Sequence, residues 1–142
     1  MKRILIILGI LCIILFVLIL YQKSDVTNEE GIKIFYKNQE FYLSYSEIRL
    51  HKQVSFTTNR DDVFSGYNIF NILSSIDIST SSNSNFTLQS RDGGSLKLTK
   101  EENETFYLVF QEDTTGQFIR LVIPTDEFSQ RWIKYIVTIE IE

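Results

Sequence analysis

Few side chains in this sequence are of the types that catalysis or metal binding uses. His51 is the only histidine, and Cys12, the only cysteine, lies inside an apolar run near the N-terminus. Zinc sites are built from clusters of histidine and cysteine, so a single histidine without such partners is typical of an exposed or capping residue. The sequence also contains no nucleophile elbow, P-loop or G-x-G-x-x-G segment. The sequence therefore gives no motif that would predict nucleophilic catalysis or nucleotide binding.

Four arginines offer a different chemistry: Arg60, Arg91, Arg120 and Arg131. A guanidinium donates hydrogen bonds in a planar fork that matches a carboxylate or a phosphate, so one interpretation is a pocket for an anion. The other is structural, with Arg120 and Arg131 paired to an acidic neighbour such as Asp126 or Glu127. Arg131 also precedes Trp132, the only tryptophan. In the structural interpretation, the indole of Trp132 lies in the core and Arg131 lies at the rim of the core.

The N-terminus carries the strongest targeting signal. Residues 4–21 are an unbroken apolar run that follows Lys2 and Arg3. As a helix this run is roughly 27 Å long, close to the thickness of a bilayer core. It predicts an uncleaved signal anchor with the C-terminal domain outside the cytoplasm. A cleaved signal peptide, or a bacterial lipoprotein lipidated at Cys12, are the alternatives.

The chain is slightly acidic, with a net charge of −4 and a pI of about 5.1. This balance argues against nucleic acid as a partner, because nucleic-acid binding depends on an excess of basic side chains. The expected partners are the membrane, through the N-terminal helix, and a small anionic ligand or another membrane protein.

The pattern along the chain predicts three parts: a transmembrane helix over residues 1–22, a polar stalk over 23–31 and one domain over 32–142. In this domain, Asp92-Gly93-Gly94 indicates a hairpin turn, since glycine takes positive φ without steric cost; a phosphate loop is the alternative interpretation. Apolar residues at helical spacing predict a helix over 66–76, and Ser44 or Ser46 is the expected N-cap of another over 44–50. About seven strands and two or three short helices give an α+β class with mostly antiparallel pairing.

Several segments resemble the molybdopterin-binding domain of the sulfite oxidase family. Residues 116–124 and 130–134 are similar to its closing motif, in which an R-L strand ending in proline is followed by Q-R-W-hydrophobic-K. Residues 64–73 and 90–98 are similar to its glycine-containing helix entry and its S-x-D-G hairpin. The resemblance implies the fold of that domain, and it implies that the regions of the four arginines converge near a pterin-like pocket.

One departure from the family pattern bears on function. The catalytic members bind molybdenum through a cysteine at the end of an early strand, where this sequence has Thr57 or Thr58. A hydroxyl is a poor substitute for a soft thiolate. We therefore expect no cofactor, and a ligand-binding or accessory module in place of an enzyme. A membrane-tethered, molybdopterin-dependent oxidoreductase is the alternative, and a structural subunit of a larger membrane complex is a third possibility.

Overall fold

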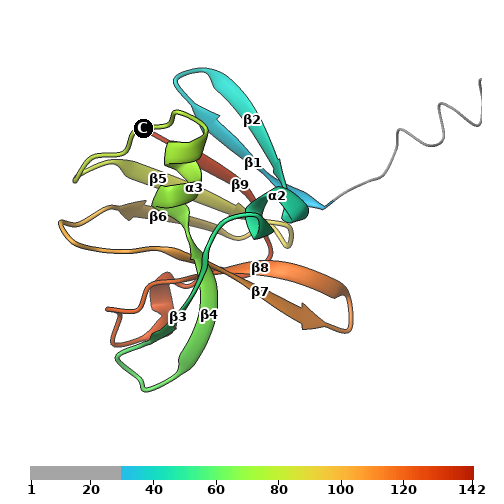
Figure 1. The fold of residues 1–142 in the computed structure, drawn as a ribbon, viewed down its shortest axis with the longest axis vertical. Coiled ribbons are helices and arrows are strands. Elements are labelled where there is room, and N and C mark those ends of the chain that lie inside the picture. Colours follow the sequence, from blue (N-terminus) through green and yellow to red (C-terminus); the bar gives the residue numbers. More distant parts are fainter. Residues whose placement is uncertain (1–29) are drawn as a thin grey trace, which may run out of the picture.

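The computed structural model describes residues 30–142, which form two β-sheets with two short helices and one 3-10 turn (Figure 1). The elements in chain order are β1 (Gly31–Tyr36), β2 (Gln39–Ser44), α2 (Tyr45–Arg49), β3 (Gln53–Thr57), β4 (Val63–Asn68), α3 (Ile69–Ser75), β5 (Asn85–Ser90), β6 (Ser95–Thr99), β7 (Tyr107–Asp113), β8 (Gly116–Val122), η1 (Ser129–Arg131) and β9 (Ile136–Ile141).

The two sheets have different topologies. One sheet has five strands in the order β2-β1-β9-β5-β6, and the other has four in the order β3-β4-β7-β8. They occupy the upper and lower parts of Figure 1, respectively. Strand pairs are antiparallel except for β1 and β9, which run parallel. The last strand is therefore inserted beside the first described one and joins the β1–β2 hairpin to the β5–β6 hairpin.

Residues with positive φ form the turns between paired strands. Lys37 and Asn38 have φ of 48° and 64° between β1 and β2, which is the geometry of a type I′ hairpin. Gly93 has φ of 90° between β5 and β6, which pair on both sides of this turn. The predicted hairpin at Asp92-Gly93-Gly94 is therefore confirmed.

Side-chain caps start both helices. The hydroxyl of Ser44 accepts the backbone N–H of Glu47, whose carboxylate accepts the Ser44 N–H at 2.8 Å, so Ser44 is the N-cap of α2 in a complete capping box. At α3, Asn68 Oδ1 accepts the Phe70 N–H at 2.9 Å. The caps stabilise helices of only five and seven residues, which are too short to be stable without packing.

Buried side chains from both sheets and from α3 form one continuous hydrophobic cluster. In β1, Ile32 and Ile34 are 1% and 2% exposed while Lys33 between them is exposed, as expected for a strand with one face on the core. Phe86 of β5 packs edge-on against Phe106, with ring centroids 5.5 Å apart. This core fixes the position of β8, which carries Arg120, and of the strands whose ends lead into the loops of Arg60 and Arg91.

The predicted α+β class is wrong. The described residues are 48% strand and 13% helix, so the domain is mostly β, with nine strands and two helices within residues 30–142. The helix predicted over residues 66–76 begins later than expected. Residues 66–68 belong to β4 and pair with β3 and β7, and α3 starts at Ile69. Hydrogen bonds to neighbouring strands outweigh the weak helical preference of so short a segment.

Within residues 30–142, no helix has both the length and the apolar character needed to cross a membrane. The predicted transmembrane helix over residues 1–22 and most of the predicted stalk lie outside the described residues.

Candidate functional site

The structure distributes the four arginines over three surroundings. Burial lowers the pKa of Arg120, and the positive charge of Arg60 lowers it further. Arg131 is bound to two buried carboxylates, and Arg91 lies on the ring of Tyr135. Arg120 is thus coupled electrostatically to Arg60, whereas Arg131 and Arg91 have partners of their own.

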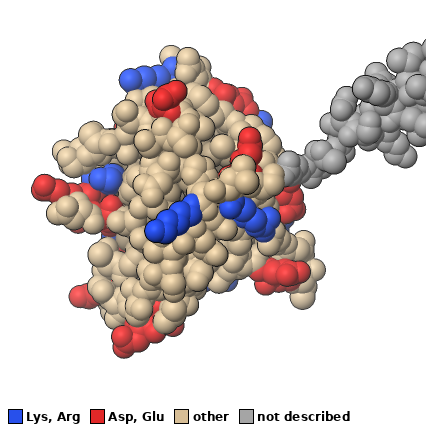
Figure 2. Space-filling view, viewed as in Figure 1, with Lys and Arg blue, Asp and Glu red and all other residues tan. Residues whose placement is uncertain are grey.

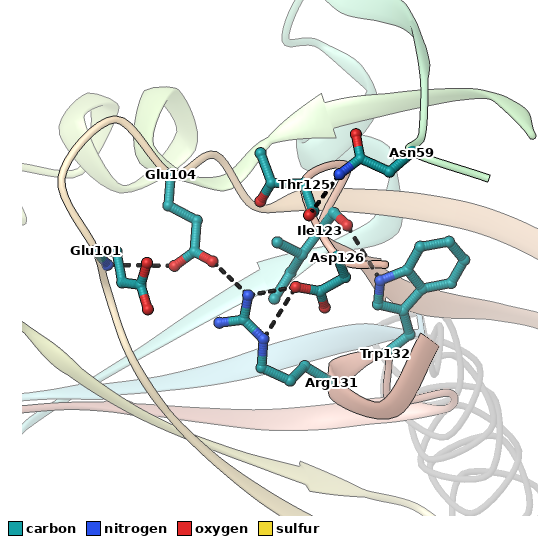
Figure 3. Close-up of polar contacts among 8 residues, drawn as sticks. All are labelled: Asn59, Glu101, Glu104, Ile123, Thr125, Asp126, Arg131 and Trp132. Carbon is teal, nitrogen blue, oxygen red and sulfur yellow. Dashed lines mark hydrogen bonds and ion pairs between the residues drawn. The ribbon is translucent and has the colours of Figure 1, made fainter. Parts of the chain in front are cut away.

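Arg131 has a structural role (Figure 3). Its Nη2 donates to Glu104 Oε1 at 2.7 Å and also to Asp126 Oδ1, and its Nε donates to Asp126 Oδ1 at 3.0 Å. Glu104 and Asp126 are only 6% and 7% exposed, and Glu104 also accepts the Glu101 N–H. Burial by itself lowers the pKa of Arg131, but the hydrogen bonds to the two carboxylates outweigh it and raise the pKa. The guanidinium is therefore committed to the protein.

Arg91 belongs to a polar network at the β7–β8 turn. Its Nη2 donates to Thr115 Oγ1 at 3.1 Å, and its guanidinium lies 5.1 Å from the centroid of the Tyr135 ring. The Tyr135 hydroxyl donates to Asp113, which also accepts from the hydroxyl and the N–H of Thr115. The bonds from Thr115, and then that from Tyr135, lower the pKa of Asp113 to about 2. Arg91 is thus anchored to the turn.

Arg120 differs from the other three because one of its donors lacks an acceptor. The side chain extends from β8 over the ring of Trp132, at 5.2 Å from the centroid. Its Nε is buried and has no hydrogen-bond partner within residues 30–142. Trp132 itself is buried, donates from Nε1 to the Ile123 carbonyl at 3.2 Å and meets Phe64 edge-on. The indole lies in the core as predicted, but the arginine on it is Arg120.

Arg60 lies on the exposed loop after β3. Its nearest acidic neighbour is Asp62, at 3.9 Å between Nε and Oδ2, with both side chains about half exposed. The charge of Asp62 only partly offsets the effect of Arg60 on the pKa of Arg120. An exposed pair at this distance is weak, so Arg60 is free to turn toward a ligand.

Backbone contacts fix the loop of Arg60 to the segment that follows β8. Asn59 donates from its N–H to the Pro124 carbonyl at 3.0 Å and from Nδ2 to the Thr125 carbonyl at 2.8 Å (Figure 3). Thr58 is 3% exposed, and its hydroxyl accepts the Arg60 N–H. The loop is therefore attached to the segment that connects β8 with Trp132.

We define the candidate site as Arg60, Arg120 and Trp132. Arg120 lies over the Trp132 ring and is influenced by the positive charge of Arg60, and positive charge of this kind attracts an oxyanion. Across the face shown in Figure 2, by contrast, lysine, arginine and acidic side chains are scattered among uncharged ones, without a broad basic area.

Neither residue at the position where the resemblance implies a thiolate is a thiol. Thr57 is exposed, and the hydroxyl of Thr58 is buried and accepts the Arg60 N–H. The only cysteine and the only methionine of the chain, Cys12 and Met1, lie outside the described residues. Residues 30–142 also contain no group of three histidine, cysteine or acidic side chains placed to bind a metal ion.

No protein-family model matches this chain, and no curated protein matches it. The resemblance to the sulfite oxidase family therefore stays a prediction from the motifs.

Two residues that shape this region were missed by sequence reasoning. Asn59 lies among the polar residues 59–62, whose composition gives no sign that it attaches this loop to residues 124 and 125. Glu104 lies in the charged residues 99–105, a composition typical of exposed segments, and nothing in the pattern separates it from Glu101 or Glu102. Only the partners that come from distant segments distinguish these residues.

Proposed function

We propose that residues 30–142 form a binding module for a small oxyanion, a ligand with a carboxylate, phosphate or sulfate group, which Arg120 holds with assistance from Arg60. The observation that carries the proposal is the buried Nε of Arg120, which has no acceptor within the described residues. Burying a donor without a partner costs about 1–3 kcal/mol, and more when the group is charged. When the side chain turns Nε outward, Nε and one terminal nitrogen can donate together to an anion, and this removes the cost.

The surroundings of Arg120 support a ligand of this charge. The guanidinium packs against the Trp132 ring, so less side-chain freedom is lost when two parallel hydrogen bonds form. Arg60 adds a second positive charge that repels Arg120 in the absence of an anion. An anion bound between the two arginines is attracted to both, and these attractions offset the repulsion. Because Arg60 is exposed, its share is smaller and falls with salt.

Anion binding by the purified full-length chain tests the proposal. The chain is kept in phosphatidylcholine nanodiscs, because the sequence predicts a membrane segment, and is titrated calorimetrically with sulfate, inorganic phosphate and succinate. A charge-assisted hydrogen bond contributes roughly 1.5–3 kcal/mol. Arg120→Gln should therefore weaken binding of the preferred anion by about 10- to 100-fold, and Arg60→Gln by only a few-fold.

Arg91→Gln is the matched control, since it removes the same charge from an arginine outside the site. Its affinity for the anion should stay near that of the wild type. If none of the three anions binds, or if Arg91→Gln weakens binding as much as Arg120→Gln, the proposal is wrong. Circular dichroism of each variant shows whether its fold is retained.

The predicted anchor is part of the proposed function. In this reading, residues 4–21 tether the module to the outer side of the membrane, where it presents its ligand to a membrane protein partner or collects it from outside. Fractionation should find the full chain in the membrane pellet after carbonate washing. Protease added to intact cells should degrade the domain. Release by carbonate, or protection from protease, would contradict this part.

The enzymatic alternative gains no support from the side chains of residues 30–142. A membrane-tethered oxidoreductase would purify with a molybdenum cofactor, which elemental analysis of the full chain would detect.

A further inference from the structure

The outer face of the five-stranded sheet is a second, separate surface with the features of a binding site. The strand registers place side chains there in two rows, each crossing all five strands. The row between them, which includes Ile34, Leu88 and Ile139, is turned to the core. The first outer row consists of Tyr42, Lys33, Thr138, Gln89 and Ser95, and the second of Glu40, Phe35, Glu140, Thr87 and Lys97.

This face is hollowed. A groove of about 910 Å³ runs over β1, β9 and β5 and is walled on one side by the loop over residues 79–84. A second hollow of about 420 Å³ over β5 and β6 adjoins it, because Glu140 and Glu142 line both. The volume of the larger groove lies at the upper end of the range for small-molecule sites.

The chemistry of the larger groove is neutral and rich in paired donors and acceptors. Phe35 presents a half-buried ring that is outside the core cluster, and Tyr36 and Ile141 also line the groove. Two lysines and two glutamates balance in charge, and Lys33 is already paired with Glu40 at 3.1 Å. The other polar side chains of the lining carry amides or hydroxyls, among them Tyr36, Asn83, Gln89 and Thr138.

We propose that this groove binds a neutral oligosaccharide. A sugar ring has one face of C–H groups, which packs on an aromatic ring such as that of Phe35, and a rim of hydroxyls that both donate and accept. Amides such as those of Gln89 and Asn83 also do both, so they match hydroxyl pairs. The open groove leaves room for several sugar units in a row.

Other occupants fit less well. An extended peptide binds by pairing with a free strand edge, and β1, β9 and β5 are interior strands paired on both sides. A nucleic acid needs an excess of cations, and the charges of the groove balance. A purely apolar ligand would leave the many amides and hydroxyls without partners.

Titration of the isotope-labelled full chain in phosphatidylcholine nanodiscs with maltohexaose, cellohexaose and chitohexaose tests this proposal by NMR. At least one of them should shift the amide signals of β1, β5 and β9. Phe35→Thr should weaken that binding by about tenfold or more, and Gln89→Ala should weaken it by a few-fold. Phe128→Thr is the matched control, because Phe128 is 66% exposed and does not line the groove, and it should bind as the wild type does.

The amide spectrum of each variant reports its fold, and Gln89→Ala keeps the test decisive if Phe35→Thr does not fold. Absence of binding by all three saccharides, or equal losses in Phe35→Thr and Phe128→Thr, overturns the proposal. The groove shares no residue with the site of Arg60 and Arg120. Added sulfate should therefore leave the saccharide shifts unchanged, and either site can fail without the other.

Discussion

Replacing Arg131 by methionine should destabilise the domain more than any other change of a single arginine. Methionine keeps much of the length of the side chain and removes its charge and its donors. Glu104 and Asp126 would then be left as buried carboxylates without a cation, each less than a tenth exposed. Asp126 is especially vulnerable, because its Oδ2 is buried without a partner in the described structure even when Arg131 is present.

The expected magnitude follows from burial. Removing one partner of a fully buried ion pair costs about 3–5 kcal/mol. The side chain of Arg131 is itself 35% exposed, so water already screens its charge in part. Glu104 also keeps its hydrogen bond from the Glu101 N–H. We therefore expect a loss of about 3 kcal/mol in the free energy of unfolding, at the lower end of that range.

Urea unfolding of the full chain at pH 7, followed by circular dichroism, measures this loss. With a denaturant dependence of about 1.5 kcal/mol per molar, the midpoint should fall by roughly 2 M. Arg60→Met is the matched control, because its exposed pair with Asp62 should contribute at most about 1 kcal/mol. Adding Glu104→Gln and Asp126→Asn to Arg131→Met should restore part of the stability. Equal midpoints for Arg131→Met and Arg60→Met would refute the reasoning.

Three further results are expected. Thr115→Val should raise the pKa of Asp113 from about 2 toward 3.8, which a carbon-13 NMR titration measures, and an unchanged pKa would contradict the assigned hydrogen bonds. Folding lowers this pKa, so the ionised Asp113 stabilises the folded state above about pH 4. That stabilisation is lost as the pH falls toward 2. Gly66→Ala would place a Cβ 2.9 Å from the Leu108 carbonyl oxygen and should lower the unfolding free energy by roughly 1–3 kcal/mol, whereas an unchanged urea midpoint would show that β4 shifts freely. Ser44→Ala should cost about 1 kcal/mol in the same assay and Ser44→Asp much less, and equal losses would argue against the capping role.

Local features of the fold were predictable from the sequence. The hairpin at Gly93 follows from the conformational freedom of glycine, and the helix after Ser44 follows from a capping box within four residues. Strand β9 follows from an alternating β-branched run at the end of the chain. Each of these depends on neighbours along the chain, so a short window contains the necessary information.

The predicted α+β class was wrong because it depends on contacts between segments that are far apart in the chain. The helical spacing that predicted a helix over residues 66–76 is real, but its first three residues gain more from pairing with β3 and β7. β7 begins about forty residues further along the chain, so no local window reports its presence. The charged stretch 99–105 is a comparable case, because Glu104 is buried only through its distant partner Arg131.

The sequence by itself determined which side chains were available: arginines with forked donors, one tryptophan, one histidine and no thiol in the domain. Only the tertiary structure decided their use. It paired Arg131 with two buried carboxylates and left Arg120 on the indole of Trp132 with a donor free of acceptors in the described residues. The physical reason is that a guanidinium has the same chemistry at every position. Its role depends on whether folding places an acidic group beside it, and that depends on contacts between segments far apart in the chain.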